Sequence, residues 1–247
     1  MRHLSRSAFV CFLENHDQVA NTGFGTRLYN SVDRALWRTM SALLLLGPAT
    51  PLLFQGVERA ASEPFTYFAD HDEALADAVR TGRLKFLAQF PSLRDPDARD
   101  RIPSPEDESA FRACQLGWHA DRGRRPCLES PRRSVGAPPN RPGPVTPRHI
   151  GVQVHSSAST ATLLVLRYEA AAGERLLLFN FGEREELLMN DPLLAPPRGS
   201  GWEVVWSSER LSHGGQGNEE SFGPGRWLLQ ARCAWLLEAH SRDAVSR

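Results

Sequence analysis

The stretch AFVCFLENHDQ, residues 8–18, joins an unbroken apolar run to five consecutive hydrogen-bonding side chains. The six apolar residues 8–13 are typical of a β-strand buried on both faces, as parallel strands covered by helices are. Polar groups at the carboxyl end of such a strand lie where α/β barrels and open α/β sheets place their ligand clefts. The pattern therefore predicts that Asn15, His16 and Asp17 face a substrate. Asn and Asp also form turns and helix caps, and this structural role is the alternative.

The residues that follow alternate between helical and strand-like patterns. A helix is predicted over 33–46, ended by a Gly-Pro pair, and a second short strand over 51–54. A second helix is predicted over 73–90, with Asp72 as its cap. Strand, helix, strand, helix is the order that gives parallel strands.

Composition divides the chain into three parts, 1–118, 119–150 and 151–247. The middle part holds seven Arg and seven Pro in 32 residues, too many prolines for a helix or strand, and reads as an anomalous or disordered segment. In the third part, alternating runs separated by Pro and Gly predict short strands, as in a small antiparallel β-sandwich. These runs are 160–168, 174–182, 202–208 and 226–239.

Charge and cysteine usage exclude several functions. The 247 residues carry 29 basic and 29 acidic side chains, so no net field attracts nucleic acid, and we expect no nucleic-acid partner. The four cysteines have neither the spacing nor the histidines of a zinc site, and no metal or other cofactor is expected. The apolar stretch 40–46 is far shorter than the roughly 20 residues of a membrane span, and no signal peptide is recognised. We therefore expect no membrane association and a cytoplasmic location.

The motif FLENHDQ, residues 12–18, resembles the seventh-strand motif of the alpha-amylase superfamily of glycoside hydrolases, an aromatic followed at a fixed spacing by Asn-His-Asp. The segments 43–58, 64–71 and 85–93 narrow the resemblance to the C-terminal part of the malto-oligosyltrehalose trehalohydrolase family. A weaker resemblance over 160–208 extends it to that family's C-terminal domain. The resemblance implies an α/β plus β fold: the C-terminal end of a (β/α)8 barrel, about its last two βα units, followed by a small antiparallel β-sandwich.

The resemblance also implies roles for three residues. Retaining glycosidases use one carboxylate as nucleophile and another as acid/base, and hydrogen bonds to sugar hydroxyls stabilise the transition state further. Asp17 matches the family's third carboxylate, the transition-state stabiliser that grips the hydroxyls of the sugar being cleaved. His16 matches the histidine that assists it, and Gln18 is a neighbouring substrate contact. The substrate implied is a maltooligosaccharide of the trehalose type, cut at the α-1,4 bond next to its trehalose end.

The family's nucleophile and acid/base lie on earlier strands, upstream of residue 1. We therefore expect a fragment that is inactive alone and is completed by a missing upstream polypeptide. Glu14, Glu58 and Asp70 carry no feature that identifies a substitute nucleophile. Where the family continues with a charged helix, this chain has its Arg/Pro-rich segment, and a pair of compensating frameshifts over about 119–159 is a hypothesis that resequencing tests. The alternative function is a noncatalytic carbohydrate-binding or interaction protein.

Overall fold

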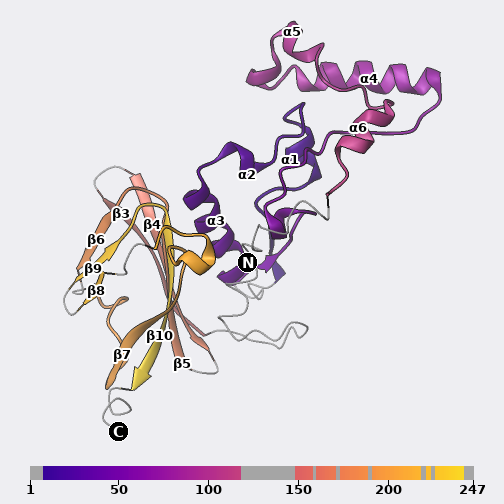
Figure 1. Ribbon diagram of the computed structural model, residues 1–247. Helices are drawn as coiled ribbons and strands as arrows, with labels where there is room; N and C mark the ends of the chain where they lie inside the picture. Colours follow the sequence, from indigo (N-terminus) through magenta and orange to yellow (C-terminus); the bar gives the residue numbers. More distant parts are fainter. Residues whose placement is uncertain are drawn as a thin grey trace. The chain divides into compact units, whose positions relative to one another are not determined.

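The computed structural model describes residues 8–117, 148–157, 160–170, 173–188, 191–217, 221–223 and 226–241 (Figure 1). These residues form two compact units, each described here by itself. The sheet unit comprises residues 8–11 and 34–51 together with the described residues from 148 onward. The helical unit comprises residues 12–33 and 52–117.

The sheet unit is built mainly from two antiparallel sheets. The larger has five strands in the order β3, β4, β5, β10, β7, so that the last strand in the chain lies between two earlier ones. Their bounds are Arg148–Ser157, Thr160–Ala170, Gly173–Asn180, Cys233–Ser241 and Ser200–Ser207. The smaller has three strands in the order β6, β9, β8, with bounds Glu185–Leu188, Arg226–Leu229 and Ser221–Gly223.

Two central strands of the larger sheet, β5 and β10, are continuously apolar over 176–179 and 233–237, because both faces of the sheet are covered there. On β5, Leu176 and Leu178 join a core that includes Trp227 and Leu229 of the smaller sheet. The alternate residue Leu177 points to the opposite face, as the two-residue period of a strand requires. Strand β10 repeats this alternation with Cys233, Trp235 and Leu237 on one face and Ala234 and Leu236 on the other.

Helix α3, Arg34–Leu46, covers the second face of the five-stranded sheet. Its residue Ala42 is buried among side chains of the sheet, and the buried Thr39 hydroxyl donates to the carbonyl of Arg232 at 2.6 Å. Arg38 pairs with the buried carboxylate of Glu209 at 3.0 Å. The buried side of α3 thus combines small and polar residues with apolar ones.

The run 226–239, predicted as one strand segment, is two strands joined by a tight turn. Arg232 adopts a left-handed backbone with φ of 52°, and its N–H donates to the carbonyl of Gly182 at 3.0 Å. The buried Asn180 side chain donates to the carbonyls of Gln230 and Glu183, at 2.9 and 2.6 Å. The turn is held by these buried hydrogen bonds, which an apolar pattern does not reveal.

Strands β1, Val10–Cys11, and β2, Thr50–Pro51, pair in parallel, as the strand and helix order predicts. The expectation that residues 8–13 are buried on both faces is wrong. The side chains of Phe9, Val10 and Phe12 are 47%, 56% and 41% exposed. A parallel strand is buried on both faces only when helices cover a wider sheet, and the described residues supply two parallel strands of two residues each.

Among the residues described, the helical unit contains five α-helices and two short 3-10 turns. The helices are α1 (His16–Ala20), α2 (Leu28–Ser31), α4 (Glu73–Leu87), α5 (Pro96–Arg99) and α6 (Glu108–Ala113). The 3-10 turns are η2 (Val57–Arg59) and η3 (Pro91–Leu93). Helices α2 and α5 are single turns. Helix α4 begins as predicted, because Asp72 accepts a hydrogen bond from the N–H of Leu75 at 3.0 Å. It ends at Leu87, three residues before the predicted end.

Strand β3 begins at Arg148, so the last three residues of the segment 119–150 are extended rather than irregular. Residues 118–147 lie outside the described residues, and the division into 1–118, 119–150 and 151–247 stays a prediction. None of the helices in the described ranges is both long and apolar enough to cross a membrane.

Candidate functional site

The predicted site residues lie together in the first turn of α1, in the helical unit. Asn15 caps this helix: its side-chain oxygen accepts hydrogen bonds from the N–H groups of Asp17 and Gln18, at 2.8 and 3.3 Å. The Gln18 side chain accepts in return from the N–H of Asn15 at 3.1 Å, which completes a capping box. Asn15 therefore has the structural role of a cap, and Gln18 is tied to the backbone.

The side chains of His16 and Asp17 lie on the surface of the helical unit. Their side chains are 67% and 70% exposed, and His16 Nε2 lies 3.5 Å from Asp17 Oδ1. Because the cap fixes the backbone of residues 16 and 17, both side chains extend into solvent from a defined position. A carboxylate in this setting can accept two hydrogen bonds from neighbouring hydroxyls, which is the chemistry expected of a sugar contact.

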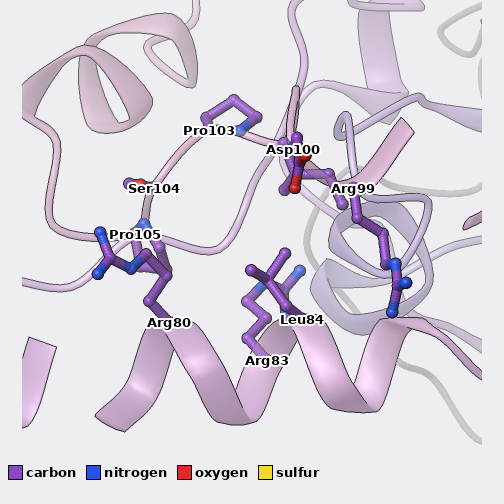
Figure 2. Close-up of a pocket in the computed structure, with 9 residues that line it drawn as sticks. Arg80, Arg83, Leu84, Arg99, Asp100, Pro103, Ser104 and Pro105 are labelled. Carbon is purple, nitrogen blue, oxygen red and sulfur yellow. The ribbon is translucent and has the colours of Figure 1, made fainter. Parts of the chain in front are cut away.

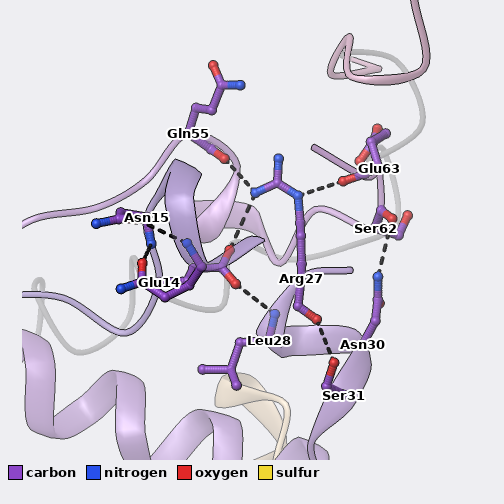
Figure 3. Close-up of polar contacts among 10 residues, drawn as sticks. Glu14, Asn15, Arg27, Leu28, Asn30, Ser31, Gln55, Ser62 and Glu63 are labelled. Atoms are coloured by element: carbon purple, nitrogen blue, oxygen red, sulfur yellow. Dashed lines mark hydrogen bonds and ion pairs between the residues drawn. The ribbon is translucent and has the colours of Figure 1, made fainter. Parts of the chain in front are cut away.

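A buried ion pair holds the segment that carries α1. Glu14, next to the cap, is 5% exposed, and its Oε1 lies 3.4 Å from Nη1 of Arg27, which is 1% exposed (Figure 3). Its Oε2 accepts from the N–H of Leu28 at 2.7 Å. Both carboxylate oxygens are occupied in this way, so Glu14 is a structural residue and not a substitute nucleophile.

Arg27 also joins two further segments of the helical unit. Its Nε donates to the carbonyl of Glu63 at 2.6 Å and its Nη1 to the carbonyl of Gln55 at 2.8 Å. Its guanidinium lies 5.2 Å from the centre of the Phe54 ring. Arg27 therefore ties the chain before α1 to the chain that follows β2. The structural role of Arg27 is not evident from the sequence, because a buried arginine looks like a surface one in a single sequence.

Glycine is required where these segments approach each other. Gly25 has φ of 68°, and a Cβ there would lie 2.5 Å from the backbone nitrogen of Phe65. Gly56 has φ of 88°, and a Cβ there would lie 2.7 Å from that of Ala61. Both positions combine a left-handed backbone with a contact that admits no side chain.

A hollow of about 540 Å³ begins at Gln55, whose carbonyl binds Arg27. Aromatic rings supply much of its wall, and Phe65 and Phe68 meet edge to face with centroids 5.9 Å apart. The full lining is Gln55, Phe65, Phe68, Phe111, Cys114, Gln115 and Leu116. Apolar rings and amide groups together suit a carbohydrate. Neither His16 nor Asp17 lines this hollow.

The other carboxylates considered from the sequence stay on the surface. Glu58, in η2, and Asp70 are exposed, and Asp70 lines a separate hollow of about 590 Å³ beside Phe68 and Phe111. Within the described ranges, no group of three or more His, Cys, Asp or Glu side chains is arranged to hold a metal ion.

Comparison with known proteins places these residues in a family context. The chain is 35% identical over 184 residues to a malto-oligosyltrehalose trehalohydrolase from Deinococcus radiodurans, a match that covers 71% of this chain and 28% of that protein. It is 37% identical over 111 residues to one from Arthrobacter ramosus, covering 44% of this chain and 18% of that protein. The resemblance to trehalohydrolases is confirmed. The chain spans less than a third of the length of these relatives.

Two further comparisons concern the fold. Residues 154–232 match a family model described as a domain of unknown function, DUF3459. A putative alpha amylase from Salmonella typhimurium superposes with a TM-score of 0.64 at 22% identity, over 95% of this chain and 36% of that one. A trehalose-6-phosphate hydrolase from Bacillus licheniformis gives 0.51 at 11% identity, over 94% and 43%. The fold of this chain therefore resembles a portion of the fold of alpha-amylase-type enzymes.

Proposed function

We propose that this chain supplies the C-terminal part of a trehalose-releasing glycoside hydrolase. Residues 1–118 contribute the last two βα units of a (β/α)8 barrel, and residues 151–247 form the antiparallel domain after it. The reaction is hydrolysis of the α-1,4 bond next to the trehalose end of a maltooligosyltrehalose. The single observation that carries this proposal is the 35% identity over 184 residues to a malto-oligosyltrehalose trehalohydrolase.

Asp17 is the residue we assign to the chemistry. An oxocarbenium-like transition state develops positive charge on the sugar ring, and a carboxylate that binds the ring hydroxyls stabilises that charge. Asp17 is 70% exposed and stands on a capped helix, which supports its assignment as the transition-state stabiliser. His16, 3.5 Å away, assists it, and Gln18 contacts substrate only through the part of its amide that the capping box leaves available.

The nucleophile and the acid/base come from a polypeptide segment upstream of this chain. Of the carboxylates near Asp17, Glu14 is buried against Arg27 and leaves no oxygen for a sugar. The chain by itself is therefore expected to release no trehalose. In the completed enzyme, Asp17 would face the cleft that the missing strands close.

A chimera tests this proposal directly. The segment of the Deinococcus radiodurans trehalohydrolase that aligns with this chain is replaced by the chain, and trehalose release from maltooligosyltrehalose is measured. The chimera is expected to be active, and Asp17→Asn is expected to lower kcat by a hundredfold or more, on the order of 3 kcal/mol of lost transition-state stabilisation. Asp77→Asn is the matched control, because the Asp77 side chain is 67% exposed and lies outside the site.

Two results would count against the assignment. Equal activity of the Asp17→Asn and Asp77→Asn chimeras would remove the catalytic role of Asp17. A chimera that folds but releases no trehalose, while this chain alone binds maltooligosaccharides, would favour the noncatalytic carbohydrate-binding alternative. The aromatic hollow at Gln55 is where such binding would then be sought.

A further inference from the structure

A hollow of about 280 Å³ in the helical unit is lined on opposite sides by arginines (Figure 2). Arg80 and Arg83 project from one face of α4, three residues apart, and Arg99 comes from the end of α5. Ser104 adds a hydroxyl group, and Asp100 is the one carboxylate among the residues that line it. None of the residues assigned to sugar hydrolysis belongs to this hollow.

The charges of these three arginines are balanced to different extents. Arg80 is neutralised, because its Nη2 lies 2.5 Å from Asp77 and its Nη1 lies 3.5 Å from Glu106. Arg83 and Arg99 pair with no carboxylate among the residues that the structure describes. Two cationic side chains therefore border the hollow without an anionic partner.

The surroundings of Arg83 and Arg99 leave donors available. Arg83 donates through Nη2 to the carbonyl of Ala20 at 2.9 Å and lies over the Tyr67 ring at 4.9 Å, while burial lowers the pKa of its guanidinium. The Nε of Arg99 is buried and, within the described part of the chain, meets no acceptor. A buried donor without an acceptor is uncommon in proteins, and a bound anion would satisfy it.

We propose that this hollow, the arginine pocket, binds the phosphate group of a small phosphorylated ligand. Guanidinium groups present planar forks of N–H donors that match phosphate oxygens, and two of them supply the charge that a phosphate needs. The volume equals the share of roughly nine water molecules in the liquid, enough for a phosphate and a small body attached to it. The apolar part of the wall would receive that body; it consists of Leu84, Ile102, Pro103 and Pro105.

Isothermal titration calorimetry on the full chain tests the arginine pocket without reference to catalysis. The probes are inorganic phosphate and phenyl phosphate, each compared with sodium chloride at equal ionic strength. Saturable binding of both phosphates is expected, tighter for phenyl phosphate because its ring contacts the apolar wall. Arg99→Gln is expected to weaken binding about tenfold or more, as the loss of a charge-assisted hydrogen bond does. Arg99→Lys keeps the charge but loses the planar fork of donors, so its phosphate affinity is expected to lie between those of the native chain and Arg99→Gln.

Arg94→Gln is the matched control, because Arg94 is exposed and lies outside the pocket five residues earlier in the chain. It is expected to change phosphate affinity less than twofold. The proposal is overturned if phosphate produces no more heat than chloride, or if a folded Arg99→Gln variant binds as the native chain does. Equal losses in the Arg94 and Arg99 variants would also overturn it, because they would show only a general effect of net charge.

Discussion

Replacing Glu14 by alanine removes one half of the most buried ion pair at the candidate site. Arg27, 1% exposed, then keeps its hydrogen bonds to two backbone carbonyls but loses the one carboxylate that pairs with it among the described residues. The N–H of Leu28 also loses its acceptor. An uncompensated buried charge costs about 3–5 kcal/mol. The matched control is Glu108→Ala, whose pair with Arg112 is 2.6 Å long but has both side chains about 70% exposed. That change should cost about 0.2–1 kcal/mol.

Hydrogen exchange is the suitable assay, because it reports the change amide by amide, whereas five of the six tryptophans lie in the sheet unit. The tryptophans within the described ranges all belong to the sheet unit; they are Trp37, Trp202, Trp206, Trp227 and Trp235. In Glu14→Ala, amides in the segment 14–31 should exchange at least a hundredfold faster, as the loss of about 3 kcal/mol implies. A change no larger than that of Glu108→Ala would refute the view that this ion pair holds α1 in place.

Three further substitutions test other parts of the account. Gly25→Ala should destabilise the helical unit by about 2 kcal/mol or more, since its Cβ would meet the backbone of Phe65. Gly82→Ala in α4, where the space is open, should stabilise the unit by about 0.5–1 kcal/mol. Amide exchange in the helical unit should therefore become faster in the first variant and slower in the second, and a change in the same direction in both would contradict this. Leu177→Ala should lower the free energy of unfolding of the sheet unit by about 2–5 kcal/mol, measured by tryptophan fluorescence in urea, and a loss below 1 kcal/mol would place Leu177 outside the core. Asn15→Ala should cost α1 about 1 kcal/mol and speed exchange of its amides severalfold, and unchanged exchange would rule out the cap.

The parts of the fold that follow from local patterns were predictable. Helix α3 was expected over 33–46 and spans Arg34–Leu46, and α4 begins behind its predicted cap Asp72. The parallel pairing of β1 and β2 followed from the order of strands and helices. These features depend on periodicity, capping and stop signals, which a single sequence carries.

Features that depend on contacts between distant residues were not predictable. The turn that separates β9 from β10 depends on Asn180, about fifty residues earlier in the chain. The buried side of α3 includes the polar Thr39, whose hydroxyl finds an acceptor at Arg232. A pattern of hydrophobicity assigns such side chains to the surface, because it contains no information about their partners.

At the candidate site, the sequence indicated the residues that face solvent but not those that hold them. Asn15 proved to be a cap, the alternative that its residue type had left open. Glu14 was considered only as a spare carboxylate, whereas it is buried against Arg27, thirteen residues away. Nothing in the spacing of two opposite charges distinguishes a buried pair from two surface residues.

The central claim is that Asp17 binds the hydroxyls of the sugar being cleaved. A crystal structure of the chimera bound to a maltooligosyltrehalose tests it most directly. The nucleophile of the chimera is replaced for this purpose, so that the substrate stays intact. The account predicts that both carboxylate oxygens of Asp17 accept hydrogen bonds from hydroxyls of one glucose ring, with His16 beside them. A substrate that fills the cleft while Asp17 points to solvent and touches no sugar would contradict it.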